Sequence, residues 1–170
     1  FVNKNESFFY EIDKNSLKFS SVGNKKFNGY FDFKPFYLKA AFNFEGISAK
    51  DILKNDSILV EIFKSEILNN QNLNVNIDLN VNDITNVDHL NDLKLKLNLD
   101  QGNITFSKSR IMWKDDLEIN LKEGLLSYDQ NEISLIGKLT INANNIDNFY
   151  KSFQIKKVHR KKMNRLELDF

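Results

Sequence analysis

Few side chains in this 170-residue chain have the types and spacing that catalysis requires. The two histidines are His89, which follows Asp88, and His159, which lies among basic residues. A catalytic triad needs a nucleophile, a base and a group that orients the base. The sequence contains no Gly-x-Ser-x-Gly elbow that would mark a nucleophile. We therefore expect no catalytic residues and predict that the protein is not an enzyme.

The adjacent carboxylates Asp115 and Asp116 do not change that expectation. Neighbouring residues of a strand point to opposite faces, so the two side chains would not converge on one substrate. Aspartate is common in turns because its side chain bonds to nearby backbone. A glycan hydrolase would need two carboxylates about 5 to 9.5 Å apart in a cleft. The sequence marks no such pair, and we predict a turn at 115–116.

Amide and carboxylate side chains occupy every second position of one segment: Asn74, Asn76, Asp78, Asn80 and Asn82. A calcium loop needs a sharp glycine turn and a bidentate glutamate. Along a strand, alternate residues lie about 6.5 to 7 Å apart, too far to share one ion. The chain also has no cysteine, which excludes thiolate metal sites. We expect no metal and no cofactor, and interpret the segment as a solvated sheet face.

One local concentration of charge stands out in a chain whose formal charge is only +1. The basic residues between positions 156 and 165 are Lys156, Lys157, His159, Arg160, Lys161, Lys162 and Arg165. Nucleic-acid modules combine such charge with stacking aromatics, but the nearby Phe149, Tyr150 and Phe153 also fit the buried face of a short helix. We expect no nucleic-acid partner. Lys156, Lys157, Arg160, Lys161 and Lys162 are candidates for anionic headgroup contact, about 1 kcal/mol each; a solvated loop is the alternative.

The clearest structural pattern is the alternation from Leu73 to Val81, where aliphatic residues occupy the odd positions and polar residues the even ones. A strand with this pattern has one apolar and one polar face. The same pattern recurs from Leu93 to Leu99. Either a protein core or a lipid could cover the apolar face, and the pattern does not choose between them. The candidate lipid-binding residues are Leu73, Val75, Ile77, Leu79, Val81, Leu93, Leu95, Leu97 and Leu99.

The rest of the chain predicts short strands around these two. Aromatic residues alternate between positions 8 and 44, Pro35 indicates a connection, and turn signals recur every 8 to 12 residues, as in all-antiparallel proteins. The period changes over about 47–70, where a capping-box-like start at Ser48 precedes a helix with Leu59, Phe63 and Ile67 on one face. We predict that this helix docks on the sheet, that a polar loop covers 82–91, and that a short helix spans about 146–153.

These elements predict a single, mainly β domain over residues 1–170, with two or three short helices and a helical insert at about 47–70. A β-sandwich is the alternative architecture. The sequence has no apolar run of about 18 residues and no signal-peptide pattern. Since it opens with Phe1 and stops in mid-alternation at Phe170, we expect a fragment of a longer chain.

The placement of glycines within the strand series resembles the pattern of a known protein family. The segments that carry it are Gly102–Trp113, Leu117–Leu121, Gly124–Tyr128, Ile133–Ile141 with Gly137 inside it, and the helical Ile146–Phe153, preceded by Phe42–Gly46 and the capped helix. This succession resembles the AsmA-like family of bacterial envelope proteins, over most of residues 36–170.

The resemblance implies an elongated, curved antiparallel sheet that forms an open β-groove with an apolar concave face. It implies a non-enzymatic role in phospholipid transfer and outer-membrane homeostasis, with phospholipid acyl chains and neighbouring β-segments of the same chain as partners. It also implies a periplasmic location, tethered to the inner membrane by an anchor outside this sequence. A structural or adhesive β-domain without lipid binding is the alternative function.

Overall fold

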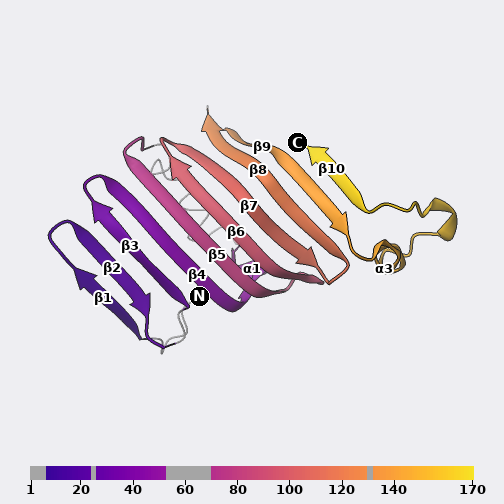
Figure 1. Ribbon diagram of the computed structural model, residues 1–170, viewed down its shortest axis with the longest axis horizontal. Coiled ribbons are helices and arrows are strands. Elements are labelled where there is room, and N and C mark those ends of the chain that lie inside the picture. Colours follow the sequence, from indigo (N-terminus) through magenta and orange to yellow (C-terminus); the bar gives the residue numbers. More distant parts are fainter. Residues whose placement is uncertain (1–6, 24–25, 53–69, 130–131) are drawn as a thin grey trace.

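The computed structural model describes residues 7–23, 26–52, 70–129 and 132–170. Ten strands form one open sheet whose spatial order is the order of the chain (Figure 1). This confirms the prediction of a mainly β protein. The strands are β1 (Phe8–Ile12), β2 (Ser16–Ser21), β3 (Phe27–Phe33), β4 (Phe36–Ser48), β5 (Leu73–Thr85), β6 (Leu90–Asp100), β7 (Asn103–Trp113), β8 (Leu117–Asp129), β9 (Glu132–Ala143) and β10 (Arg165–Asp169).

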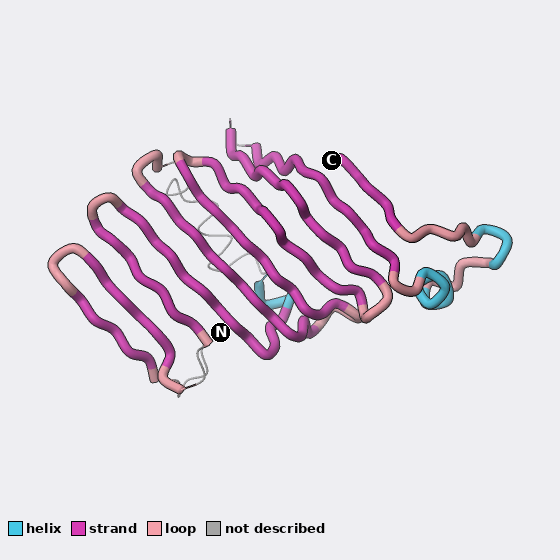
Figure 2. Tube along the Cα trace, viewed as in Figure 1, coloured by secondary structure: helices cyan, strands magenta, loops and turns pink. Residues whose placement is uncertain are grey.

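Helical structure is short and lies outside the sheet (Figure 2). The described helices are α1 (Ala49–Ile52), α3 (Ile146–Ser152) and the 3-10 turn η2 (Lys157–His159). The predicted insert at about 47–70 starts at Ala49, because β4 continues through Ser48. The expected helix with Leu59, Phe63 and Ile67 on one face lies outside the described residues.

All neighbouring strands are antiparallel except β4 and β5, which pair in parallel from Phe36–Leu73 to Ser48–Thr85. A parallel pair needs a long crossover, and the chain between 49 and 72 supplies one. The expected antiparallel pairing therefore holds for every other pair in the sheet. This exception could not be predicted from the alternation, which is the same in parallel and antiparallel pairs.

The sheet does not close on itself: β1 and β10 are its two edges. Every strand in the described part of the chain belongs to this one sheet, so no second layer of strands faces it there. The sandwich alternative required such a layer. The open architecture is the one that the chain adopts.

The strand register aligns apolar side chains across almost the whole width of the sheet. Directly paired residues lie on the same face, and one continuous row, called here the Leu99 row, crosses nine strands from β1 to β9. Its members are Ile12, Leu17, Phe31, Leu38, Val75, Leu99, Ile104, Leu126 and Leu135.

A second row of paired residues, beside the Leu99 row, contains glycines that lie under aromatic rings. A Cβ on Gly29 of β3 would lie 2.6 Å from the Phe19 ring and 2.6 Å from the Lys39 carbonyl oxygen. A Cβ on Gly137 of β9 would lie 2.5 Å from the Glu123 carbonyl oxygen. Glycine is needed at both positions because a neighbouring strand or ring occupies the space of a side chain.

The predicted connections are present, with one difference in length. Lys34 and Pro35 join β3 to β4, and Asp115 and Asp116 lie in the turn between β7 and β8. The expected polar loop at 82–91 is shorter than predicted, since β5 extends to Thr85 and β6 begins at Leu90. The β-pairing of Asp83 with Asn91 explains the difference.

Candidate functional site: the apolar face of the sheet

The structure brings the nine predicted aliphatic residues onto one face of two neighbouring strands. Eight of them form four cross-strand pairs between β5 and β6: Val75–Leu99, Ile77–Leu97, Leu79–Leu95 and Val81–Leu93. The ninth, Leu73, pairs with Phe36 of β4. This surface, together with the Leu99 row, is called the apolar face below.

The two ends of the apolar face on β5 and β6 are packed cores. Val75, Leu99 and Ile104 form one buried cluster, against which Leu38, Leu73, Ile77, Leu97, Phe106 and Leu126 pack. Val81, Ile84, Ile47 and Ala49 form a second, with Phe44, Leu79, Leu90, Leu93 and Ile111 against it. Val81 and Leu99 are only 1% and 2% exposed.

Between these two clusters the apolar face is less deeply packed. Ile77, Leu79, Leu95 and Leu97 are half-buried, although they alternate in the same strands as the buried residues. Toward the edges, members of the Leu99 row become exposed, at Ile12 in β1 and Leu135 in β9. The apolar face is therefore not uniformly sealed along its length.

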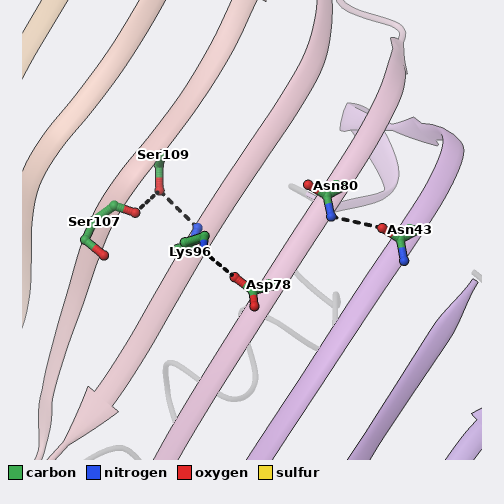
Figure 3. Close-up of polar contacts among 6 residues, drawn as sticks. All are labelled: Asn43, Asp78, Asn80, Lys96, Ser107 and Ser109. Atoms are coloured by element: carbon green, nitrogen blue, oxygen red, sulfur yellow. Dashed lines mark hydrogen bonds and ion pairs between the residues drawn. The ribbon is translucent and has the colours of Figure 1, made fainter.

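The opposite face of β4–β6 is polar and its side chains bond to one another. Asn80 donates its Nδ2 to Asn43 Oδ1 at 2.9 Å, and Lys96 Nζ lies 3.5 Å from Asp78 Oδ1 (Figure 3). Asn76 Nδ2 donates to the Tyr37 hydroxyl at 3.0 Å. These hydrogen bonds and this ion pair link neighbouring strands, so the alternating polar residues stabilise the sheet on this face.

Arg110 extends the polar face onto β7. Its guanidinium contacts Asp92 Oδ2 at 2.5 Å and Glu118 Oε1 at 3.8 Å, so it links β6, β7 and β8. Lys94 is its register partner on β6. Two like charges opposite each other are unfavourable, and the two carboxylates offset that repulsion.

An aromatic cluster fastens α3 to the end of the sheet. The Trp113 ring packs 5.2 Å from Phe149 and 5.6 Å from Phe153, and Phe149 lies 4.7 Å from Phe153, measured between centroids. Asp116 bonds to the same helix segment through its backbone oxygen, which accepts from Asn144 N and Asn145 N. The sequence showed Ile111–Trp113 only as an apolar stretch without alternation. In the structure Trp113 contacts α3, whereas Ile111 packs against the cluster around Val81.

The predicted basic residues lie beyond α3, in and around η2. Lys156, Lys157, Lys161 and Lys162 are exposed. Arg160 is half-buried, and its Nε donates to the Ile155 carbonyl at 2.8 Å, so this side chain helps to fold the loop. Arg165 pairs with Glu167 on β10.

Among the described residues, neither histidine ring forms a hydrogen bond or an ion pair. His89 packs edge-on against Trp113 at 5.5 Å between centroids, and His159 lies in η2. No grouping of three or more metal-ligating side chains occurs in the described ranges. The helices within those ranges are too short and too polar for any of them to cross a bilayer.

A scan against protein-family models, a search of curated proteins and a search of solved structures each found no match to this chain. The resemblance to the AsmA-like family therefore rests on strand pattern and glycine placement alone.

Proposed function

We propose that the apolar face of the sheet binds phospholipid acyl chains, as a non-enzymatic lipid-transfer segment of the bacterial envelope. The observation that supports this best is an apolar face that continues across nine strands of an open sheet and is only half-buried at its centre, at Ile77, Leu79, Leu95 and Leu97.

The dimensions of the apolar face suit an acyl chain. Nine strands at about 4.8 Å spacing span about 38 Å across the sheet. One leaflet of a bilayer is about 15 Å of hydrocarbon, half of the roughly 30 Å core. The apolar face is therefore wide enough across the strands for two acyl chains end to end. On β5 and β6 its more accessible part is the half-buried stretch at Ile77 and Leu79, since Val75 and Leu99 are buried.

The chemistry of the apolar face also suits such a ligand. Each methylene removed from water contributes about 0.8 kcal/mol, so binding of an acyl chain requires no polar recognition group. The polar face of the same strands carries Asp78, Lys96 and several asparagines, which favour water over lipid. Binding is therefore expected on one face only.

Single cysteines provide a direct test, because the chain has none of its own. Leu95→Cys and Lys96→Cys place a label on opposite faces of adjacent positions in β6. Each variant is labelled with a nitroxide-quenchable fluorophore and mixed with phospholipid carrying a nitroxide on its acyl chain. We expect strong quenching at position 95 and little at position 96. Equal quenching at both positions, or none at 95, would contradict acyl-chain binding on this face.

A second measurement concerns affinity. Leu95→Gln introduces an amide at the half-buried centre, whereas Lys96→Gln introduces the same side chain on the polar face. We expect the first variant to bind fluorescent phospholipid several-fold more weakly and the second to bind as the unaltered protein does. Circular dichroism and urea unfolding would show that both variants keep the sheet.

The alternative function, a structural or adhesive β-domain, makes the opposite prediction. Protein purified from cells would then carry no phospholipid, and the label at position 95 would sense protein contacts only. The proposed location is the periplasm, with tethering to the inner membrane in the full-length protein. Cell fractionation with an antibody against this sheet tests that part separately.

A further inference from the structure

The segment from 153 to 164, called here the basic loop, extends past the ends of the neighbouring strands. It follows α3, contains η2 and returns to β10, and in Figure 1 it reaches away from the sheet beyond β9. Only its last residue bonds to a strand, since Ala143 N of β9 donates to Asn164 O at 2.8 Å, and no strand of the described chain pairs with the rest. Its side chains are consequently free to meet a surface that the sheet does not contact.

Charge is strongly concentrated around this loop. Between Asp147 and Glu167, the chain has seven of its 24 lysines and arginines and none of its 23 acidic residues. The remainder therefore has 17 basic and 23 acidic residues, a formal charge of −6 against +7 here. Within the described ranges, no ion pair links Lys156, Lys157, Lys161 or Lys162 to a carboxylate.

The loop is held in one shape by hydrogen bonds that do not use the side chains of those four lysines. His159 N donates to Lys156 O at 2.9 Å, and Arg160 Nε donates to Ile155 O at 2.8 Å. The Tyr150 hydroxyl donates to the Lys161 carbonyl at 2.8 Å and lies 3.3 Å from the Lys161 amide nitrogen. The basic side chains are thus presented on an ordered backbone and lose less entropy on binding than those of a flexible tail.

At the centre of this charge lies an aliphatic residue: Val158 is 81% exposed, within η2. Lysines precede it at 156 and 157 and follow it at 161 and 162. We infer that the basic loop docks on an anionic phospholipid surface, with Val158 entering the interface and the four lysines contacting lipid phosphates. Apolar residues flanked by lysine are typical of such contacts, since the charge is attracted to anionic headgroups and the apolar group enters below them.

A nucleic acid fits the same charge less well. Single-stranded nucleic acid would require aromatic rings on which bases can stack. Here Phe149 and Phe153 pack against Trp113, and Tyr150 bonds to the loop backbone. The residue that the loop presents most fully is an aliphatic one, which offers no stacking surface.

Sedimentation with lipid vesicles tests the inference. The full chain is mixed with vesicles of phosphatidylcholine alone, or of equal parts phosphatidylcholine and phosphatidylglycerol. We expect binding to the anionic vesicles only, weakened by added salt. Replacing two lysines, as in Lys156→Gln/Lys157→Gln, is expected to lower the partition coefficient more than about tenfold.

Matched variants separate loop contact from net charge. Lys14→Gln/Lys34→Gln removes the same charge from two exposed turns near the opposite end of the sheet and is expected to have little effect. Val158→Ser is expected to weaken binding without altering charge, and Val158→Trp to strengthen it. All of these residues are exposed, so folding is not expected to depend on them.

Three results would overturn the inference: equal binding to both kinds of vesicle, equal loss for the two lysine pairs, or tighter binding to a single-stranded oligonucleotide than to anionic vesicles. The outcome is independent of the acyl-chain proposal. Loss of quenching at position 95 with retained vesicle binding would reject only the apolar face, and the reverse result would reject only the loop.

Discussion

Leu99 and Ile12 occupy the same row on the same face of the sheet, yet their surroundings differ completely. Leu99 in β6 is 2% exposed, whereas Ile12 in edge strand β1 is 64% exposed. Both follow the same alternation of apolar and polar residues. The comparison teaches that alternation sets the face to which a side chain points, while the neighbouring strands and layers decide how deeply it is buried.

The buried and the exposed ends of this row also lie in strands of different length. The central strands β4 to β9 have 11 to 13 residues, whereas β1 has 5 and β2 has 6. A longer strand contributes more side chains to the packing around each of its neighbours. Four large apolar residues of β1, Phe8, Phe9, Tyr10 and Ile12, are accordingly all well exposed.

The largest loss of stability is expected at Leu99, the buried member of this row. Leu99→Ala removes a fully buried side chain from the Val75–Ile104 cluster and should lower the free energy of unfolding by about 2 to 5 kcal/mol. Ile12→Ala changes the same row at its exposed end and should cost less than about 1 kcal/mol. Urea unfolding measures both. Similar values for the two variants would mean that burial differs less between centre and edge than described.

Two glycines test whether the end of the sheet with the shorter strands is also closely packed. Gly29→Ala would place a Cβ 2.6 Å from the Phe19 ring and the Lys39 carbonyl, and should cost about 1 to 3 kcal/mol. Gly46→Ala in β4 would meet only Asp83 O at 3.7 Å, an ordinary contact, and should be tolerated. Thermal unfolding of both variants checks this; a harmless Gly29→Ala would contradict the close approach.

A smaller effect is expected where α3 joins the sheet. Asp116 is buried and its Oδ1 accepts from Asn148 Nδ2 at 3.1 Å. Asp116→Ala should cost about 0.5 to 1.5 kcal/mol, because the exposed amide of Asn148 loses its hydrogen bond to a buried carboxylate. Asp115→Ala alters the exposed neighbour and should have almost no effect. Equal destabilisation by the two variants would indicate that the turn, and not this hydrogen bond, determines stability.

The smallest effect concerns the other edge strand, β10. Hydrogen bonds from Arg165 and Lys122 hold the pKa of the Glu167 carboxyl below its ordinary value of 4.5. Because the folded-state pKa is lowered, these contacts stabilise β10 fully above pH 4.5 and are lost as the pH falls through the folded-state value. An NMR titration of Glu167 should therefore give a midpoint below 4.5, and Lys122→Gln should raise it.

Much of the fold was predictable because alternation depends only on local sequence. The structure contains the predicted strands at 73–81 and 93–99, the predicted turn at Asp115–Asp116 and the predicted helix near 146–153. The four cross-strand pairs of β5 and β6 also follow from the alternation once the two strands are neighbours.

What the sequence did not predict depends on partners distant in the chain. The parallel pairing of β4 with β5 and the contact of Trp113 with Phe149 and Phe153 join segments 30 or more positions apart. Local pattern has no information on either. The same limit applies to the candidate site: residues such as Val75 and Leu95 alternate identically, but only the folded neighbourhood makes one buried and the other half-buried.

The parallel pairing has a consequence for how the chain assembles. It divides the sheet into two meanders, β1–β4 and β5–β9, each built from strands that follow one another closely, and β10 joins the second after α3 and the basic loop. Phe36 and Leu73, by contrast, meet across 37 positions, and closing a longer loop has a higher entropic cost. We expect each meander to form early from local contacts and the two to join last. Both buried clusters include residues of β4 and β5. The free energy gained by burying these apolar side chains is therefore obtained only when the two meanders join.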